Sequence, residues 1–375
     1  MSEHAMTFPE VTHLLELLRW RVGQTPQGEA LRRLRKGVWV GVTWAEAMAQ
    51  SRAVAAGLLS LGVRPGDQVG IMSRTRYEWV IGYWGALVAG CVCVAMDVGG
   101  LRTQLRSQLE ATAVSAVLVE DPLSMGKLLD ACNSIQRQPK VIYFDAWSPR
   151  PAAVPTKGAE DGRTQVLLDD VIGWPPPAHI TSFDELLEMG QVHLARVPGC
   201  LREAEAQVQP QSPAGIAYSC GSSGAPRAVW LSHANFLWAS SSLSGLLSCT
   251  SDDVHLFSLP LAHLAGRVLL WVSVVSGMSL ALSGECEESL SHMEQVQPTV
   301  LAQFPAFFER LRARLVAEHE GKGKLKKRLF SWALAREPEP TASRPLLQKL
   351  RDSFADQWVL KRLRARQGGR VRVAL

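Results

Sequence analysis

The chain has 375 residues, of which 47% are hydrophobic, and a net charge of +5 from 40 Lys and Arg against 35 Asp and Glu. This composition excludes a chain that is disordered overall, and the nearly balanced charge argues against a nucleic-acid-binding protein. Seven cysteines occur without a Cys-x-x-Cys spacing. We therefore expect no disulfide framework and no metal site, and a reducing, cytoplasmic compartment.

Helix and strand patterns alternate along the first half of the chain. Thr43 and Glu46 form a capping box that starts a helix, and Gly62 is placed to end it. Further helices are expected over 77–88, 101–111 and 183–189, and strands over 69–72, 91–95, 113–119 and 141–144. Such alternation indicates a parallel sheet with helices on both faces.

The regular pattern lapses between residues 147 and 177, a proline-rich stretch that predicts a surface loop or insertion. A polar linker over 207–213 then precedes a second alternating half. Its expected strands are 215–218, 254–258, 278–282, 300–303 and 371–375, the last one buried, and its expected helices are 235–247, 268–275 and 305–318. The sequence thus predicts an α/β fold of two doubly wound, mostly parallel sheet subdomains, 1–206 and 207–375.

Two apolar stretches, 79–96 and 268–282, invite comparison with membrane spans. A span needs about 20 consecutive apolar residues. The first stretch is interrupted by Gly82, Gly85 and Gly90, and the second is short and contains Gly277. Both patterns favour a buried helix that leads into a buried strand.

A loop rich in glycine and serine opens the second half, within 218–236 (YSCGSSGAPRAVWLSHANF). Glycines allow backbone amides to approach an anion closely, serine hydroxyls add donors, and arginine adds a planar charged fork that suits phosphate. These features belong to Ser219, Gly221, Ser222, Ser223, Gly224 and Arg227. The loop alone leaves phosphate binding and a plain solvent loop equally open. Neither a Walker lysine nor a Gly-x-Ser-x-Gly elbow is present.

The surroundings of this loop resemble the signature of adenylate-forming (AMP-binding) enzymes. Residues 258–267 (SLPLAHLAGR) resemble the corresponding block of long-chain fatty acyl-CoA synthetases, and 297–310 (QPTVLAQFPAFFER) resemble a later block. Segments 41–44, 66–71 and 327–334 fit the same family, so the resemblance covers nearly the whole chain. Its order of motifs makes it specific.

The resemblance implies ATP-dependent activation of a fatty acid to an acyl-adenylate and then to an acyl-CoA, with ATP, Mg²⁺ and coenzyme A as cofactors or co-substrates. Ser219, Gly221, Ser222, Ser223, Gly224 and Arg227 would hold the phosphates, with Arg227 in a catalytic role. His263 would lie at the substrate pocket, although a helix-capping or core histidine is the alternative from the residues alone. Leu261, Leu264 and Val268 would line an acyl channel or simply belong to the core. Peripheral contact with a membrane stays open.

The sequence departs from the family pattern at Cys220, Arg227 and Ala228, where serine, lysine and glycine are usual. The family's Tyr-Gly-x-Thr-Glu segment, with its magnesium-binding carboxylate, does not occur in the 375 residues. From these differences we expect an incomplete, inactive part of a synthetase that lacks the C-terminal small domain. The alternatives are a non-catalytic relative that binds ATP or acyl groups, and a fatty acyl-AMP ligase that feeds a carrier protein.

Overall fold

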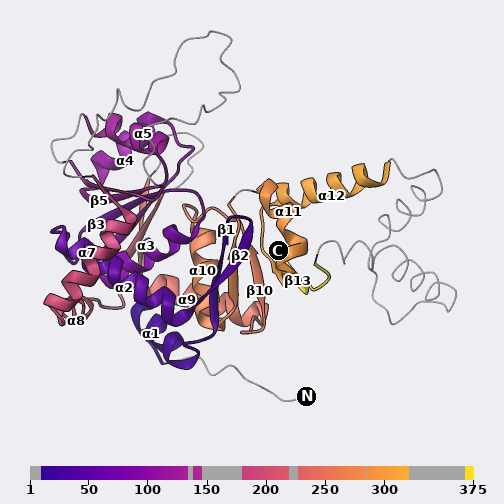
Figure 1. The fold of residues 1–375 in the computed structure, drawn as a ribbon, viewed down its shortest axis with the longest axis horizontal. Coiled ribbons are helices and arrows are strands. Elements are labelled where there is room, and N and C mark those ends of the chain that lie inside the picture. The colour runs from indigo at the N-terminus through magenta and orange to yellow at the C-terminus, as the bar shows by residue number, and fades with distance from the viewer. Residues whose placement is uncertain (1–9, 134–137, 146–179, 219–226, 285, 321–367) are drawn as a thin grey trace, which may run out of the picture.

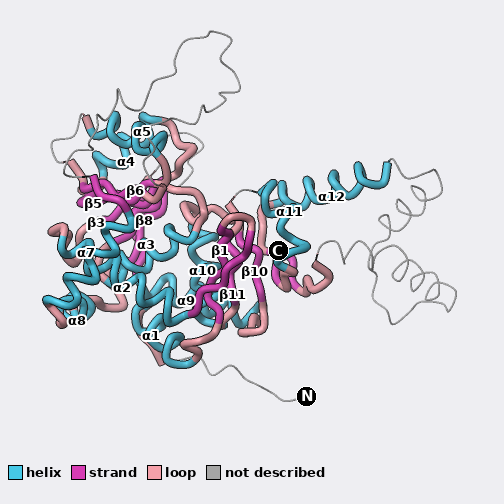
Figure 2. The backbone as a smooth tube through the Cα atoms, viewed as in Figure 1, coloured by secondary structure: helices cyan, strands magenta, loops and turns pink. Residues whose placement is uncertain are grey.

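The computed structural model describes residues 10–133, 138–145, 180–218, 227–284, 286–320 and 368–375, and its strands form two sheets (Figures 1 and 2). The seven-stranded sheet has the order β7-β6-β5-β3-β4-β8-β9 and the six-stranded sheet the order β13-β12-β10-β11-β1-β2. All described pairings are parallel except β8 with β9 and β1 with β2. The predicted α/β class with mostly parallel sheets is confirmed.

Strands of the seven-stranded sheet alternate with helices along the chain. The strands are β3 (Gln68–Met72), β4 (Val92–Met96), β5 (Val114–Val119), β6 (Lys140–Tyr143), β7 (Ile180–Ser182), β8 (Pro213–Tyr218) and β9 (Ala228–Ser232). The helices among them are α2 (Trp44–Ser60), α3 (Tyr77–Val88), α4 (Arg102–Ala111), α5 (Pro122–Cys132), α7 (Phe183–Arg196) and α8 (Cys200–Ala206).

The six-stranded sheet combines the start of the chain with its later part. Its strands are β1 (Glu29–Arg35), β2 (Val38–Thr43), β10 (Val254–Phe257), β11 (Ser279–Leu282), β12 (Val300–Leu301) and β13 (Val373–Ala374). The helices around it are α1 (Leu14–Gln24), α9 (His233–Leu247), α10 (Leu264–Ser276), α11 (Cys286–Val296) and α12 (Pro305–Glu320), the last of which projects from the body (Figure 1).

Both faces of the seven-stranded sheet are covered, which follows from the alternation of side chains along each strand. In β3, Val69 and Ile71 face the core shared with α2 and α3, whereas Met72 belongs to a second core. That second core includes Leu105 of α4 and Met125 of α5, on the opposite face (Figure 1). Strands buried on both faces contain continuous apolar residues, as seen in β4 and β5.

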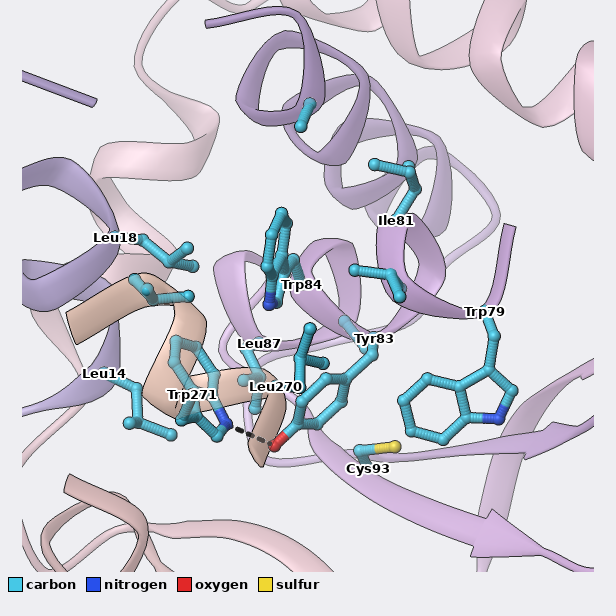
Figure 3. Packing of buried hydrophobic residues seen from close by; sticks show 14 of the residues in the cluster. Leu14, Leu18, Trp79, Ile81, Tyr83, Trp84, Leu87, Cys93, Leu270 and Trp271 are labelled. Atoms are coloured by element: carbon cyan, nitrogen blue, oxygen red, sulfur yellow. Dashed lines mark hydrogen bonds between the residues drawn. The ribbon is translucent and has the colours of Figure 1, made fainter. Parts of the chain in front are cut away.

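The core between the two sheets is built around aromatic side chains of α3 and α10 (Figure 3). The Trp271 indole nitrogen donates a hydrogen bond of 3.0 Å to the Tyr83 hydroxyl, in a buried position. Trp84 lies 6.5 Å from Trp271 and 6.0 Å from Trp44, measured between ring centroids. Large rings in contact bury more apolar area than other side chains, so this cluster binds the two sheets into one body.

A buried arginine joins α1 to the end of α10. Arg21 donates hydrogen bonds of 2.8 and 2.5 Å to the carbonyl oxygens of Val274 and Val275. Those carbonyls belong to the last turn of α10, where no further intrahelical donor exists and the helix dipole favours a cation. Burial lowers the pKa of the Arg21 guanidinium to about 10, so it remains charged at neutral pH.

The last described strand is held at the sheet edge by its backbone pairing with β12 and by an ion pair beside it. Arg372 donates from Nε to Oδ1 of Asp253 at 2.7 Å, and a second hydrogen bond joins the same two side chains. Burial opposes ionisation of Asp253, but the bonds from Arg372 and Thr299 outweigh it and lower its pKa to about 2. The expectation of a buried strand over 371–375 is wrong, because Val371 and Leu375 are exposed at the edge.

Most predicted elements appear within one or two residues, and α3 has the predicted bounds. The capping box at Thr43 and Glu46 is present. The helix predicted over 183–189 is too short, because α7 continues to Arg196, and the helix predicted to begin at residue 268 begins at Leu264. The β1–β2 hairpin was not predicted. The insertion over 147–177 falls outside the described residues.

The predicted boundary at residue 206 lies between α8 and β8, and each sheet takes strands from both sides of it. The division into two units, 1–206 and 207–375, stays a prediction. The two sheets do not follow this division, because each contains strands from both units. The apolar stretches 79–96 and 268–282 form helix–strand pairs, as expected. In the described part of the chain, every helix is too short or too polar to cross a bilayer.

Substitution of Gly190 tests the close contact between α7 and α2. A Cβ atom at Gly190 would lie 1.8 Å from the carbonyl oxygen of Ala53, so Gly190→Ala forces the helices apart. We expect the free energy of unfolding in urea to fall by at least about 2 kcal/mol.

The matched control for this substitution is Gly23→Ala in α1, where no atom lies within 4 Å of the added Cβ. Because alanine favours helix over glycine, this variant should be as stable as the wild type or more stable, by up to about 1 kcal/mol. Equal effects of both substitutions would contradict close packing at Gly190.

Candidate functional site

Segments that follow β3, β10 and β12 are joined by hydrogen bonds at the carboxyl ends of these parallel strands. In open α/β sheets the carboxyl ends of parallel strands form the crevice in which ligands bind. We call this region the carboxyl-edge site and define it by Thr75, Arg227, Ser258, His263 and Phe304. Hydrogen bonds from Thr75 join the segments of the two sheets there.

Thr75 connects the two sheets directly. Its hydroxyl donates to the carbonyl oxygen of Leu259 at 2.6 Å and accepts from the amide nitrogen of Leu261 at 3.1 Å. Both bonds are buried. Thr75 follows β3 in the seven-stranded sheet, whereas residues 258–263 follow β10 in the six-stranded sheet. A single hydroxyl thus fixes the position of the segment that ends at His263.

Gln303 orders the start of the same segment. Its side-chain nitrogen donates to the carbonyl oxygen of Leu256 at 3.0 Å, and its side-chain oxygen accepts from the Ser258 hydroxyl at 2.9 Å. Its backbone nitrogen donates to the carbonyl oxygen of Leu375 at 2.9 Å. The segments after β10, β12 and β13 are therefore linked through one glutamine.

His263 occupies the N-cap position of α10 and is exposed. Its side chain makes no capping hydrogen bond to the described helix, so the capping interpretation of this histidine is not supported by a bond. The imidazole instead contacts Phe304 edge to face, with ring centroids 5.9 Å apart, and Phe304 is itself 45% exposed. The pair stands at the surface of the carboxyl edge, while Leu261 is buried below it.

The β8–β9 hairpin flanks the predicted phosphate loop. Tyr218 at the end of β8 pairs with Ala228 at the start of β9, so residues 219–227 connect these two strands in the sequence. Ser219, Gly221, Ser222, Ser223 and Gly224 lie outside the described residues. Arg227 is described and is exposed beside the end of β8.

Charged side chains after β3 are held by carboxylates that follow β5 and β6 and by one in the first turn of α3. Arg74 donates to Glu120 from its backbone nitrogen at 2.7 Å and from Nε at 2.8 Å. Arg76 donates to Asp145 and Glu78 at 2.8 and 2.6 Å. Burial lowers the pKa of Arg76, but these carboxylates outweigh burial and raise it. Arg76 is therefore a fixed structural cation.

His255 lies under the site in the middle of β10 and is fully buried. Its Nε2 lies 3.3 Å from the backbone nitrogen and 3.4 Å from the carbonyl oxygen of Ala302, so it accepts from the first or donates to the second according to its tautomer. Burial lowers the pKa of His255 to about 4. The residue is consequently neutral at physiological pH and supports the packing of β12 on β10.

Among the described residues, no group of three or more His, Cys, Asp or Glu side chains is arranged to hold a metal ion. The sequence prediction assigned no metal ligands in this chain. We therefore assign no described side chain as a ligand of the Mg²⁺ ion that the family resemblance implies.

Of the predicted site residues, the structure describes Arg227 and His263, and both are exposed. Arg227 directly precedes β9, beside the carboxyl end of β8, and His263 lies in the segment between β10 and α10. Of the predicted acyl-channel residues, Leu261 is buried, Val268 is partly buried and Leu264 is 40% exposed. Sequence reasoning missed Thr75 and Gln303, because a single polar residue in a loop carries no distinctive signal.

A family model for AMP-binding enzymes matches residues 18–361. The chain therefore belongs to the AMP-binding enzyme family, which agrees with the resemblance inferred from its motifs.

Curated relatives carry names of fatty acyl-CoA ligases. Long-chain-fatty-acid–CoA ligase FadD15 of Mycobacterium bovis is 26% identical over 353 residues, which cover 92% of this chain and 52% of that protein. Fatty acyl-CoA synthetase A of Dictyostelium discoideum is 26% identical over 91% of this chain and 46% of its own length. This chain spans about half the length of the curated relatives that it matches.

Solved structures support the fold. The apo structure of Mycobacterium smegmatis MbtA superimposes with a TM-score of 0.62 at 22% identity, over 82% of this chain and 50% of that one. The inhibitor-bound N-terminal domain of FACL13 from Mycobacterium tuberculosis gives a TM-score of 0.58 at 18% identity, over 80% of this chain and 65% of that one. Both likenesses concern the α/β architecture alone.

Replacement of Thr75 by valine tests the connection between the sheets. Thr75→Val keeps the shape but removes the hydroxyl, which leaves the buried Leu259 carbonyl and Leu261 amide without this partner. We expect a loss of about 1–3 kcal/mol in the free energy of unfolding. Thr75→Ser retains the hydroxyl and should lose clearly less, and equal losses in the two variants would argue that packing, not hydrogen bonding, dominates.

Acid titration tests the buried state of His255. An unfolded histidine binds a proton near pH 6.5, whereas folded His255 does so only near pH 4. Its contribution to stability is therefore complete above pH 6.5 and is lost between pH 6.5 and pH 4, at a limiting slope of about 1.4 kcal/mol per pH unit. His255→Gln should show a shallower fall in urea unfolding over this window, and an unchanged slope would contradict the assignment.

Proposed function

We propose that this chain binds ATP and a long-chain carboxylic acid for ATP-dependent acyl activation. Family membership and the names of the relatives support acyl activation as the class of reaction. The observation that carries the assignment to this chain is the Thr75 contact, which joins the His263 segment to the edge of the sheet where β8 enters the glycine–serine segment. Nucleotide and acid would thus meet between two fixed edges.

The chemistry has two balanced steps. An oxygen of the acid's carboxylate attacks the α-phosphorus of ATP, and the bond to the departing pyrophosphate breaks. The sulfur of coenzyme A, which loses its proton, then attacks the activated carbonyl carbon, and AMP leaves. Positioning of the reactants and neutralisation of phosphate charge are the contributions expected of a protein in such a reaction.

Arg227 and the segment before it are proposed to hold the phosphates. Backbone amides of Gly221 and Gly224, with the hydroxyls of Ser219, Ser222 and Ser223, would donate to β- and γ-phosphate oxygens. The exposed guanidinium of Arg227 fits this role, because it lies at the start of β9 and can donate two parallel hydrogen bonds to phosphate.

His263 and Phe304 are proposed to border the opening through which the acid arrives. The two rings are in contact and exposed, and the buried Leu261 lies directly before this surface in the chain. An apolar chain could therefore pass from the rings into the apolar core region. Mg²⁺ would be held mainly by the phosphates, since the described residues offer no cluster of ligands.

A non-catalytic relative that binds ATP or acyl groups is the second candidate. Cys220, Arg227 and Ala228 favour it, because they replace the serine, lysine and glycine expected from the resemblance. A fatty acyl-AMP ligase that feeds a carrier protein is distinguished by product analysis with and without coenzyme A. Acyl-CoA formed by the purified chain from ATP, palmitate and coenzyme A would contradict the non-catalytic candidate.

Substitution of Arg227 tests the phosphate assignment. Arg227→Ala removes one charge-assisted contact, so ATP affinity measured by calorimetry should fall about ten-fold or more. Arg227→Lys keeps the charge and should retain most of the affinity. The control is Arg64→Ala, in the turn before β3 at the opposite edge of the same sheet, which should leave affinity unchanged. Unaltered binding by Arg227→Ala would contradict the assignment.

A further inference from the structure

Arg267 is a buried arginine whose charge is not compensated by any hydrogen bond within the described part of the chain. It lies in the first half of α10 and is 0% exposed. Among the described residues, none of its three guanidinium nitrogens has a hydrogen-bond partner. A desolvated, unpaired guanidinium is costly for the folded state, and arginine does not relieve the cost by losing its proton.

The described surroundings of Arg267 provide an aromatic face but no acceptor. Nη1 lies where a side chain on Gly215 of β8 would be, since a Cβ atom there would come within 3.0 Å of it. The Phe236 ring centroid lies 5.7 Å from Cζ. This ring contact offsets only a small part of the lost hydration.

Tyr83 adds a second donor to the same region. Its hydroxyl accepts from Trp271, but among the described residues no acceptor for its own proton is found. The positive charge of Arg267 acts on Tyr83, but burial, which opposes ionisation, dominates, raises the pKa of Tyr83 and keeps this phenol protonated. A guanidinium and a phenolic O–H are both hydrogen-bond donors, and together they match an anionic oxygen acceptor such as a carboxylate.

The position of Arg267 indicates how such a group could reach it. Arg267 and His263 are four residues apart across the start of α10, so they stand one helical turn from each other on the same side. A ligand that enters past the exposed His263 and Phe304 rings would meet Arg267 about one turn deeper.

We propose that Arg267, assisted by Tyr83, binds a carboxylate group of the acid substrate. This inference rests on the proposed function for the chemical class of the ligand. The carboxylate is either the one that reacts or a second one at the far end of the chain, since both present the same two oxygens. Gly215 contributes by leaving room for the guanidinium.

The test compares ligand binding and thermal stability in four proteins, each with all 375 residues of this chain. The ligands are decanoate, its uncharged analogue decanamide, and decanedioate, and the proteins are wild type, Arg267→Met, Arg267→Lys and Arg21→Met. Wild type should bind decanoate at least about ten-fold more tightly than decanamide, as expected for a charge-assisted contact. Arg267→Met should lose this preference, and Arg267→Lys should keep part of it.

Arg21 is the matched control, because it is a buried arginine at the other end of α10 whose guanidinium is bonded to two carbonyls. Without ligand, Arg267→Met should melt at a higher temperature than wild type, since it removes an uncompensated charge. Arg21→Met should melt at a lower temperature, since it leaves carbonyls unpaired, and should keep the preference for decanoate. A purely structural role for Arg267 would instead lower the melting temperature in both variants.

Three results would overturn the inference. In the first, the wild type binds decanoate and decanedioate no more tightly than decanamide. In the second, Arg267→Met keeps the preference, and in the third, its melting temperature falls as much as that of Arg21→Met. Gly215→Ala is a second test of the same site, because the added Cβ would lie 3.0 Å from Nη1, crowd the guanidinium and weaken the preference.

The choice of ligands separates the two sources of the carboxylate. Preference for decanoate over decanamide assigns Arg267 to the reacting carboxylate, whereas preference for decanedioate alone assigns it to a second, distal one. ATP binding, measured in parallel, separates this inference from the proposed function. If the wild type binds ATP but shows no preference for a carboxylate ligand, the inference about Arg267 is overturned and the proposed function is not. If the wild type does not bind ATP, the proposed function is overturned.

Discussion

The contact between Tyr83 of α3 and Trp271 of α10 is the interaction on which the arrangement of the two sheets depends. The hydrogen bond between their side chains is buried, and the surrounding tryptophans pack against both rings (Figure 3). Helix α3 connects β3 with β4 in the seven-stranded sheet, whereas α10 connects β10 with β11 in the six-stranded sheet. Packing of one helix on the other therefore helps to set how the carboxyl ends of the two sheets face each other, and the contacts between the sheets at the candidate site depend on that relation.

At the carboxyl ends, a few polar contacts convert this general arrangement into a defined geometry. Thr75 reaches across from β3 to the segment after β10, and Gln303 links that segment to the one after β12. These bonds are directional, whereas apolar packing is not, so they fix where His263 and Phe304 emerge. Loops on a rigid scaffold are a common location for ligand binding, and in the sequence the paired strands β8 and β9 precede and follow the glycine–serine segment.

Three arginines show how differently the fold treats a buried or half-buried charge. Arg21 is bonded to the last carbonyls of α10, and Arg76 is surrounded by the carboxylates of Glu78 and Asp145. Arg267 is fully buried, yet it has neither kind of partner among the described residues. The first two stabilise the protein through contacts within the chain. A ligand carboxylate would give the third the acceptor that those residues do not supply, which is the physical basis of its proposed role.

The sequence by itself determined the α/β class, the bounds of α3, the capping box at Thr43 and membership in the AMP-binding family, because these depend on local periodicity, capping and ordered motifs. It did not reveal the β1–β2 hairpin, whose strand β1 is rich in arginine and lacks an apolar pattern. It also placed the boundary at residue 206, although strands from both sides of it pair in each sheet. Only the tertiary structure decided that Thr75 joins the two sheets and that Arg267 lies buried away from every described acceptor. Such roles are set by residues far apart in sequence, and no local pattern of side chains records which distant groups will meet.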